Sequence, residues 1–200
     1  EAYIDNQCAG LKLATGDDVG RVTCRTDGIK DYTDHLYESI NGDLSGLNIC
    51  IDCANGASAA VARQLFPRLG AKCTFIGVEP DGKNINAGVG STHLDNLEKA
   101  VIEGGFDCGI AFDGDADRCL ACDEKGQEID GDKIIALLAM NMKERGCLDG
   151  NTAVVTVMSN LGFIKFMECQ GIHTEKTAVG DRYVLENMRE NGYEIGRAHV

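Results

Sequence analysis

Residues 108–118 have the sequence Cys-Gly-Ile-Ala-Phe-Asp-Gly-Asp-Ala-Asp-Arg, an apolar run that leads into three aspartates and an arginine. The apolar run predicts a buried strand, and the aspartates then lie on the loop at its carboxyl end, where α/β folds place their ligands. A second apolar run precedes Asp-Cys-Ala-Asn-Gly at residues 52–56. Together the two runs favour a parallel sheet whose loops carry the chemistry.

Around these runs, short β-rich segments alternate with longer helical ones, a pattern that predicts βαβ units. The expected strands cover 47–52, 72–77, 108–113, 119–123 and 128–129, and the expected helices cover 57–69, 93–103 and 132–145. A Lys-Gly pair at 125–126 predicts a hairpin, and therefore an antiparallel edge. The predicted fold is an α/β domain with a mixed, mostly parallel sheet and flanking helices.

The alternation resumes after a turn-rich joint at residues 147–151. Further strands are expected over 152–158 and 173–179, and further helices over 161–169 and 181–190. A sheet this small leaves an edge and a face uncovered. We therefore expect part of a second, similar α/β domain, truncated at its C-terminal end.

Composition excludes several classes of function. The 200 residues include 19 Lys plus Arg and 32 Asp plus Glu, a formal net charge of −13 that repels nucleic acid and anionic membrane surfaces. No apolar run approaches the ~18 residues that a bilayer span needs. We expect a cytoplasmic globular protein with no nucleic-acid or membrane partner. Chemistry on a phosphorylated substrate remains possible if a cation screens the acidic groups.

The ten cysteines include two pairs with two-residue spacing, Cys50 with Cys53 and Cys119 with Cys122. Two such pairs can hold a zinc ion. Both pairs nevertheless fall in segments predicted to be buried strands, where cysteine serves as a small apolar residue. Reduced, structural thiols are therefore the favoured interpretation, with a zinc site as the alternative.

The candidate metal ligands are Asp113, Asp115 and Asp117, separated only by Gly and Ala. Small spacers let the backbone curl so that the three carboxylates converge. Two like charges ~4 Å apart repel by ~4 kcal/mol at an effective dielectric constant of 20, so convergence calls for a cation. A hard divalent ion, Mg²⁺ above all, suits such oxygen ligands. The alternative is a solvated acidic turn without a ligand.

Two other known loops fit part of this stretch. An EF-hand loop starting at Asp113 would place Leu120 at its apolar position 8 and Glu124 at its ligand position 12. It would also place Arg118 at position 6, which needs glycine, and the preceding segment is predicted to be a strand where an EF-hand has a helix. Residues 110–115 also resemble the nucleophile loop of haloacid-dehalogenase-type phosphatases, with Asp113 as the nucleophile. A calcium-binding module and a phosphosugar phosphatase therefore stay open as alternatives.

Phe-Asp-Gly-Asp-Ala-Asp-Arg at 112–118 resembles the metal-binding loop of the α-D-phosphohexomutase superfamily, and in particular of its branch that acts on glucosamine phosphates. Five further stretches agree with that branch in order and spacing. They are residues 51–56, 84–94, 130–132, 158–160 and 179–185. The resemblance extends over about residues 47–196, with a weaker match upstream.

The resemblance implies an isomerase that moves a phosphoryl group by way of a phosphoserine on the family's first domain. It implies that Asp113, Asp115 and Asp117 hold Mg²⁺ and that Arg118 contacts the phosphoryl group. A structural ion pair within the loop is the alternative for Arg118. The implied substrate is a phosphorylated amino sugar, interconverted between glucosamine 6-phosphate and glucosamine 1-phosphate for amino-sugar nucleotide and cell-wall synthesis. The oligomeric state is left open.

A second loop carries the residues that the resemblance assigns to the sugar or its phosphate. They are Gly180, Asp181 and Arg182, which follow an expected strand and open an expected helix. The alternative is that Asp181 caps the helix and Arg182 is a surface residue.

The sequence also departs from the family pattern. It contains no His-Asn-Pro, the tripeptide that follows the family's phosphoserine, and 197–200 reads Arg-Ala-His-Val where a sugar-binding Glu-x-Ser-Gly-His is expected. The ending Ile-Gly-Arg-Ala-His-Val is what a common sequencing adapter encodes. We therefore expect 1–45 to be the end of family domain 1, 46–149 to be domain 2, 150–194 to be part of domain 3, and 195–200 to be a foreign tail. The 200-residue chain alone is expected to be inactive.

Overall fold

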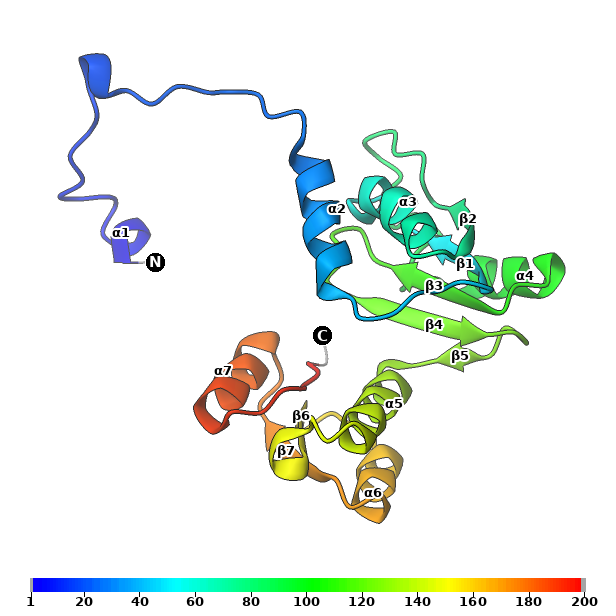
Figure 1. Cartoon of the computed structure of the whole chain (residues 1–200). Coiled ribbons are helices and arrows are strands. Elements are labelled where there is room, and N and C mark those ends of the chain that lie inside the picture. The colour runs from blue at the N-terminus through cyan, green and yellow to red at the C-terminus, as the bar shows by residue number, and fades with distance from the viewer. Residues whose placement is uncertain (1, 199–200) are drawn as a thin grey trace.

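A computed structural model describes residues 2–198. An N-terminal arm carries two short helices, α1 (Ala2–Asp5) and η1 (Gly16–Asp18), and extends away from the rest of the molecule (Figure 1). Side chains of residues 4–27 are exposed along this arm. Helix α2 (Gly28–Ser39) then packs against the first of two α/β units.

The first unit is built on a five-stranded sheet with the order β2-β1-β3-β4-β5. Its strands are β1 (Asn48–Asp52), β2 (Lys72–Ile76), β3 (Cys108–Phe112), β4 (Cys119–Asp123) and β5 (Glu128–Ile129). β1 runs parallel to β2 and β3, whereas β4 is antiparallel to β3 and to β5. The mixed sheet with an antiparallel edge confirms the fold class predicted from the sequence.

Helices α3 (Ser58–Arg68) and α4 (Asp95–Gly104) cover opposite faces of this sheet. Successive residues of a strand point to opposite faces. Ile49 and Ile51 of β1 accordingly join the core under α3, and Cys50 joins the core under α4. Complete burial of such an apolar side chain stabilises the fold by about 1.5–3 kcal/mol. Both faces are thus sealed, which leaves the strand ends for function.

The second unit is smaller. Its two parallel strands are β6 (Thr152–Thr156) and β7 (His173–Thr177), and its further elements are α5 (Gly131–Glu144), η2 (Asp149–Asn151), α6 (Leu161–Cys169) and α7 (Asp181–Asn191). Ile135, Ala136 and Ala139 of α5 share one core with Val155 and Met167. Helix α5, which the sequence analysis placed before the joint at 147–151, therefore packs with the second unit (Figure 1).

The segment after α7 returns to β6. The backbone N–H of Val154 donates to the Ile195 carbonyl at 3.0 Å, and Arg197 N–H donates to the Val154 carbonyl at 2.9 Å. The Arg197 guanidinium also pairs with Asp132 at 3.1 Å. Residues 199–200 of the expected foreign tail lie outside the described residues, and the origin of residues 195–200 stays a prediction.

The ten cysteines are all free thiols, as the favoured interpretation holds. Cys50 and Cys122 lie in the core under α4, Cys53 lies in the core under α3, and Cys119 is exposed. The two members of each pair thus lie in different surroundings, so the four thiols do not assemble the alternative, a zinc site. None of the helices within residues 2–198 has the length and apolar character that crossing a bilayer requires.

Candidate metal centre

Three loops meet at the carboxyl edge of the parallel strands, where the candidate site lies. They follow β1, β2 and β3, and backbone hydrogen bonds join them to one another. Asn86 N–H donates to the Ala54 carbonyl, and Ser91 N–H donates to the Phe112 carbonyl, both at 2.9 Å. Ala57 N–H, in the loop after β1, donates to the Gly114 carbonyl at 2.9 Å, so both neighbouring loops hold the acidic loop after β3.

The structure brings the three predicted ligands together. One carboxylate oxygen from each of Asp113, Asp115 and Asp117 lies within 4.8 Å of the other two. Asp113 is buried at 1% exposure, whereas Asp115 and Asp117 face solvent. The tight curl depends on the small spacers: Ala116 has a φ of +63°, and a Cβ on Gly114 would lie 2.6 Å from the Ile85 side chain.

Arg118 completes this loop by binding its first carboxylate twice. Its backbone N–H donates to Asp113 Oδ1 at 3.1 Å, and its Nε–H donates to Asp113 Oδ2 at 2.8 Å. Its Nε also lies 3.6 Å from Asp117 Oδ1. The structural ion pair expected as the alternative for Arg118 is thus formed. The side chain is still 42% exposed, which leaves guanidinium N–H groups accessible to a ligand.

The pKa values of Asp113 and Asp117 are shifted in opposite directions. Burial raises the pKa of Asp113, but the two hydrogen bonds and the positive charge of Arg118 outweigh it and hold that pKa below its ordinary value. Desolvation, followed by the hydrogen bond and negative charge of Asp113 and the charge of Asp115, raises the pKa of Asp117. One arginine therefore does not neutralise the cluster, and a hard divalent cation with oxygen ligands fits the remaining charge.

The structure contradicts the EF-hand alternative. An EF-hand loop joins two helices, but strands β3 and β4 flank the acidic loop here. The phosphatase alternative requires Asp113 as a nucleophile. Asp113 is 1% exposed and both of its oxygens accept hydrogen bonds from Arg118, which disfavours attack on phosphorus, whereas the second lone pair of each oxygen can still bind a cation.

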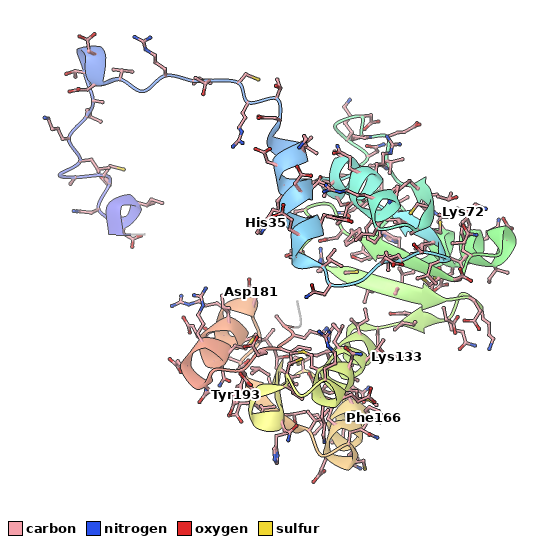
Figure 2. All side chains as sticks on the ribbon, in the orientation of Figure 1. His35, Lys72, Lys133, Phe166, Asp181 and Tyr193 are labelled. Atoms are coloured by element: carbon pink, nitrogen blue, oxygen red, sulfur yellow. The ribbon has the colours of Figure 1, made fainter. Side chains whose placement is uncertain are left out.

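The predicted sugar loop lies in the second unit, at the start of α7, where Figure 2 labels Asp181. Gly180, with a φ of +134°, occupies the N-cap position, so the expected alternative of an Asp181 cap does not hold. Asp181 Oδ1 instead accepts from Arg182 N–H at 2.7 Å, and Arg182 Nε pairs with Glu186 at 2.8 Å. Between the described atoms of 180–182 and 113–118 there is no hydrogen bond or ion pair, and the ligand role of this loop stays a prediction.

A cavity of about 370 Å³ opens beside the acidic loop, between the two units. The first unit contributes Ser91, Asp117 and Arg118 to its lining, and α5 contributes Ile134 and Leu138. A molecule bound in this cavity would therefore contact both units.

Sequence reasoning missed Asp52, the last residue of β1. Its side chain is completely buried at 0% exposure. Oδ1 accepts from Ala54 N–H at 2.9 Å, and Oδ2 accepts from Gly90 N–H at 2.8 Å. A charged residue that directly ends an apolar strand was the available signal.

Two family models match the chain. Residues 30–126 match the model described as phosphoglucomutase/phosphomannomutase, alpha/beta/alpha domain II, and residues 130–197 match domain III of the same description. The chain therefore belongs to the phosphoglucomutase/phosphomannomutase family. The second match begins just before α5, in agreement with the packing of that helix on the second unit.

Curated relatives narrow the comparison to one branch of that family. A phosphoglucosamine mutase of Clostridium tetani is 51% identical over 196 residues, which cover 98% of this chain and 44% of the relative. A phosphoglucosamine mutase of Streptomyces avermitilis is 54% identical over 182 residues, which cover 91% of this chain and 40% of the relative. The chain thus spans less than half the length of these relatives.

Solved structures confirm the fold. A phosphoglucomutase/phosphomannomutase family protein from Burkholderia thailandensis superposes with a TM-score of 0.74 at 23% identity, covering 85% of this chain and 37% of that one. An N-acetylglucosamine-phosphate mutase in its apo-form gives a TM-score of 0.59 at 22% identity, with 82% of this chain and 39% of that one covered.

Proposed function

We propose that this chain is the central part of a phosphoglucosamine mutase, an isomerase that interconverts glucosamine 6-phosphate and glucosamine 1-phosphate. The observation that carries the proposal is the convergence of Asp113, Asp115 and Asp117 at the carboxyl edge of a sheet in a chain about half identical to phosphoglucosamine mutases. In the proposed reaction, a phosphoserine on a preceding domain exchanges its phosphoryl group with the sugar.

Each residue of the acidic loop has a part in this proposal. The three aspartates would hold Mg²⁺, which when bound screens the negative charge of phosphoryl oxygens. Asp113 also fixes the Arg118 guanidinium by accepting its Nε–H at 2.8 Å. The remaining N–H groups of Arg118 are then oriented to donate to a phosphoryl oxygen, as a planar guanidinium suits.

The second unit would supply recognition of the sugar. Gly180 permits the backbone conformation, with a φ of +134°, that precedes α7. Asp181 and Arg182 lie on the exposed first turn of α7. An acid and a base side by side can bind a hydroxyl or ammonium group and a phosphate respectively. Gly180, Asp181 and Arg182 are therefore the proposed sugar-binding residues.

Phosphoryl transfer also needs the family's phosphoserine, which is followed by His-Asn-Pro. The 200 residues contain no His-Asn-Pro and therefore no serine in that pattern. A metal and an arginine without that serine have no phosphoryl group to transfer. The 200-residue chain alone should therefore show no mutase turnover, and detectable turnover by it would contradict this proposal.

The proposed setting is the cytoplasm. Ten free thiols suit a reducing compartment, and a net charge of −13 disfavours nucleic acid and anionic membranes as partners. The proposed partner is therefore the phosphorylated amino sugar.

The metal assignment is tested by titrating the chain with Mg²⁺ in a calorimeter. Asp115→Asn should weaken binding about 10-fold or more, because it removes a charged ligand from the cluster. Asp95→Asn is the matched control, since Asp95 lies at the start of α4 outside the cluster. Equal affinities of the two variants would remove the metal assignment. A preference for Ca²⁺ over Mg²⁺ would instead favour a non-catalytic cation-binding module.

A further inference from the structure

Asp52 is a buried acidic residue to which the proposed function assigns no role. It lies at the end of β1 with 0% of its surface exposed, and within residues 2–198 no lysine or arginine forms an ion pair with it. Burial of a carboxylate is costly unless hydrogen bonds compensate it. An apolar residue would complete the strand equally well, so the carboxylate serves something other than the core.

The two oxygens of Asp52 bind two different loops. Oδ1 accepts from Ala54 N–H at 2.9 Å in the loop after β1, and Oδ2 accepts from Gly90 N–H at 2.8 Å in the loop after β2. The first bond lies at a strained turn, because Ala54 and Asn55 both have a left-handed φ, of +54° and +51°. The carboxylate thus stabilises a backbone conformation that these residues rarely adopt.

These same two loops hold the backbone on either side of Asp113. Ser91, next to Gly90, donates its N–H to the Phe112 carbonyl at 2.9 Å. Ala57, three residues after Ala54, donates its N–H to the Gly114 carbonyl at 2.9 Å. Asp52 therefore binds the same two loops that hold the Phe112 and Gly114 carbonyls, the backbone groups on either side of Asp113.

Close packing leaves this junction little room to adjust. A Cβ on Gly90 would lie 2.6 Å from the Phe112 carbonyl oxygen, and a Cβ on Gly56 would overlap the Gly114 carbonyl oxygen. Backbone atoms that approach this closely move together, so a shift of either neighbouring loop displaces the acidic loop.

From these contacts we infer that Asp52 is a positioning residue, whose carboxylate ties the loops after β1 and β2 together and so holds the acidic loop in its metal-binding shape. The inference deepens the proposed function and rests on it for the metal. Asp52 itself is not in the group of converging ligand oxygens.

The test uses Asp52→Asn in the 200-residue chain. This substitution keeps the shape of the side chain but turns one acceptor into an NH₂ group, which opposes an N–H donor. We expect amide hydrogen exchange in residues 112–118 to become about 10-fold faster or more, because a hydrogen bond to a charged group is lost. Mg²⁺ affinity should fall about 10- to 100-fold, the usual effect of disturbing groups behind metal ligands.

Val101→Ala is the matched control. Val101 lies at 0% exposure in the core under α4, so its truncation destabilises the same unit without touching the loops bound by Asp52. It should leave Mg²⁺ affinity and loop exchange within about twofold of the wild-type values after correction for global stability. If Asp52→Asn does not fold, Asp52→Ser keeps an oxygen acceptor in a smaller side chain but cannot reach both loops, and it should give both effects.

Each outcome decides the inference. Loop exchange at the level of the Val101→Ala control overturns it, and so does faster exchange with unchanged Mg²⁺ affinity. If the wild-type chain binds no Mg²⁺, the metal part of the proposed function fails, and the exchange comparison alone decides whether Asp52 holds the loop.

Discussion

The pair formed by Asp113 and Arg118 joins a buried acid to a half-exposed base. Arg118 is the reason that the pKa of Asp113 lies below its ordinary value despite burial. A carboxyl whose pKa is lowered by folding stabilises the folded state above its unfolded pKa, near 3.8, and loses that contribution as the pH falls through its lower folded value. The pair should therefore stabilise the protein at neutral pH and not in strong acid.

Arg118→Ala tests this at the scale of a single residue. We expect the free energy of unfolding at pH 7 to fall, because buried Asp113 loses the hydrogen bond and the positive charge of the guanidinium, although partial solvation of the arginine reduces the effect. The difference from wild type should shrink as the pH falls through the lowered folded pKa of Asp113, where the paired carboxylate takes up a proton. Urea unfolding at pH 7 and at pH 3 measures both values.

Arg182→Ala is the control, because Arg182 pairs with Glu186 on an exposed helix surface, where solvent screens the pair, and its loss should change stability much less. A loss in Arg118→Ala that is no larger than in this control, or that is independent of pH, would show that Asp113 does not depend on Arg118.

Among the elements, α5 connects the first sheet to the core of the second unit. Its N-cap residue, Asp130, accepts a hydrogen bond from Lys133 N–H at 2.9 Å. An aspartate in this position satisfies an otherwise unpaired N–H group, and its negative charge interacts favourably with the positive end of the helix dipole. The stability of the second unit should therefore depend on this one side chain.

Asp130→Ala should lower the free energy of unfolding by about 1 kcal/mol. Asp27→Ala is a matched control, because Asp27 occupies the N-cap position of α2 but makes no capping hydrogen bond from its side chain. It should change stability by less than half as much. Chemical denaturation followed by circular dichroism compares the two, and equal losses would refute the capping role of Asp130.

At this scale the sequence predicted most of the structure. The strand expected over 47–52 is observed as β1 over Asn48–Asp52, and the helix expected over 161–169 is α6 over Leu161–Cys169. Apolar periodicity and turn residues are local signals, and they suffice to locate such elements. The convergence of the three aspartates was predictable for the same reason, since they lie within five consecutive residues.

What could not be predicted depends on contacts between residues far apart in the chain. Asp52 and Gly90 are 38 positions apart, and nothing near either residue shows that they meet. The packing of α5 on the second unit likewise depends on Val155 and Met167, which follow it in the chain. Such pairings depend on the three-dimensional arrangement of the elements, which local patterns do not encode.

The whole molecule consists of two α/β units with separate cores, and the acidic loop lies beside the cavity between them. Under the proposed function, a phosphorylated sugar would span both units, with its phosphate near Arg118 and its sugar at the second unit, and a phosphoserine would come from a preceding domain. We therefore propose that residues 30–194 can serve as the middle of a phosphoglucosamine mutase.

A chimaera tests that claim most directly. Residues 30–194 would replace the matching segment of the Clostridium tetani phosphoglucosamine mutase, to which this chain is 51% identical. We predict that the folded chimaera converts glucosamine 6-phosphate to glucosamine 1-phosphate only with Mg²⁺ present, and that Asp115→Asn in the transplanted segment lowers kcat/KM at least about 100-fold. A folded chimaera without activity, or one in which Asp115→Asn has no effect, would contradict the account.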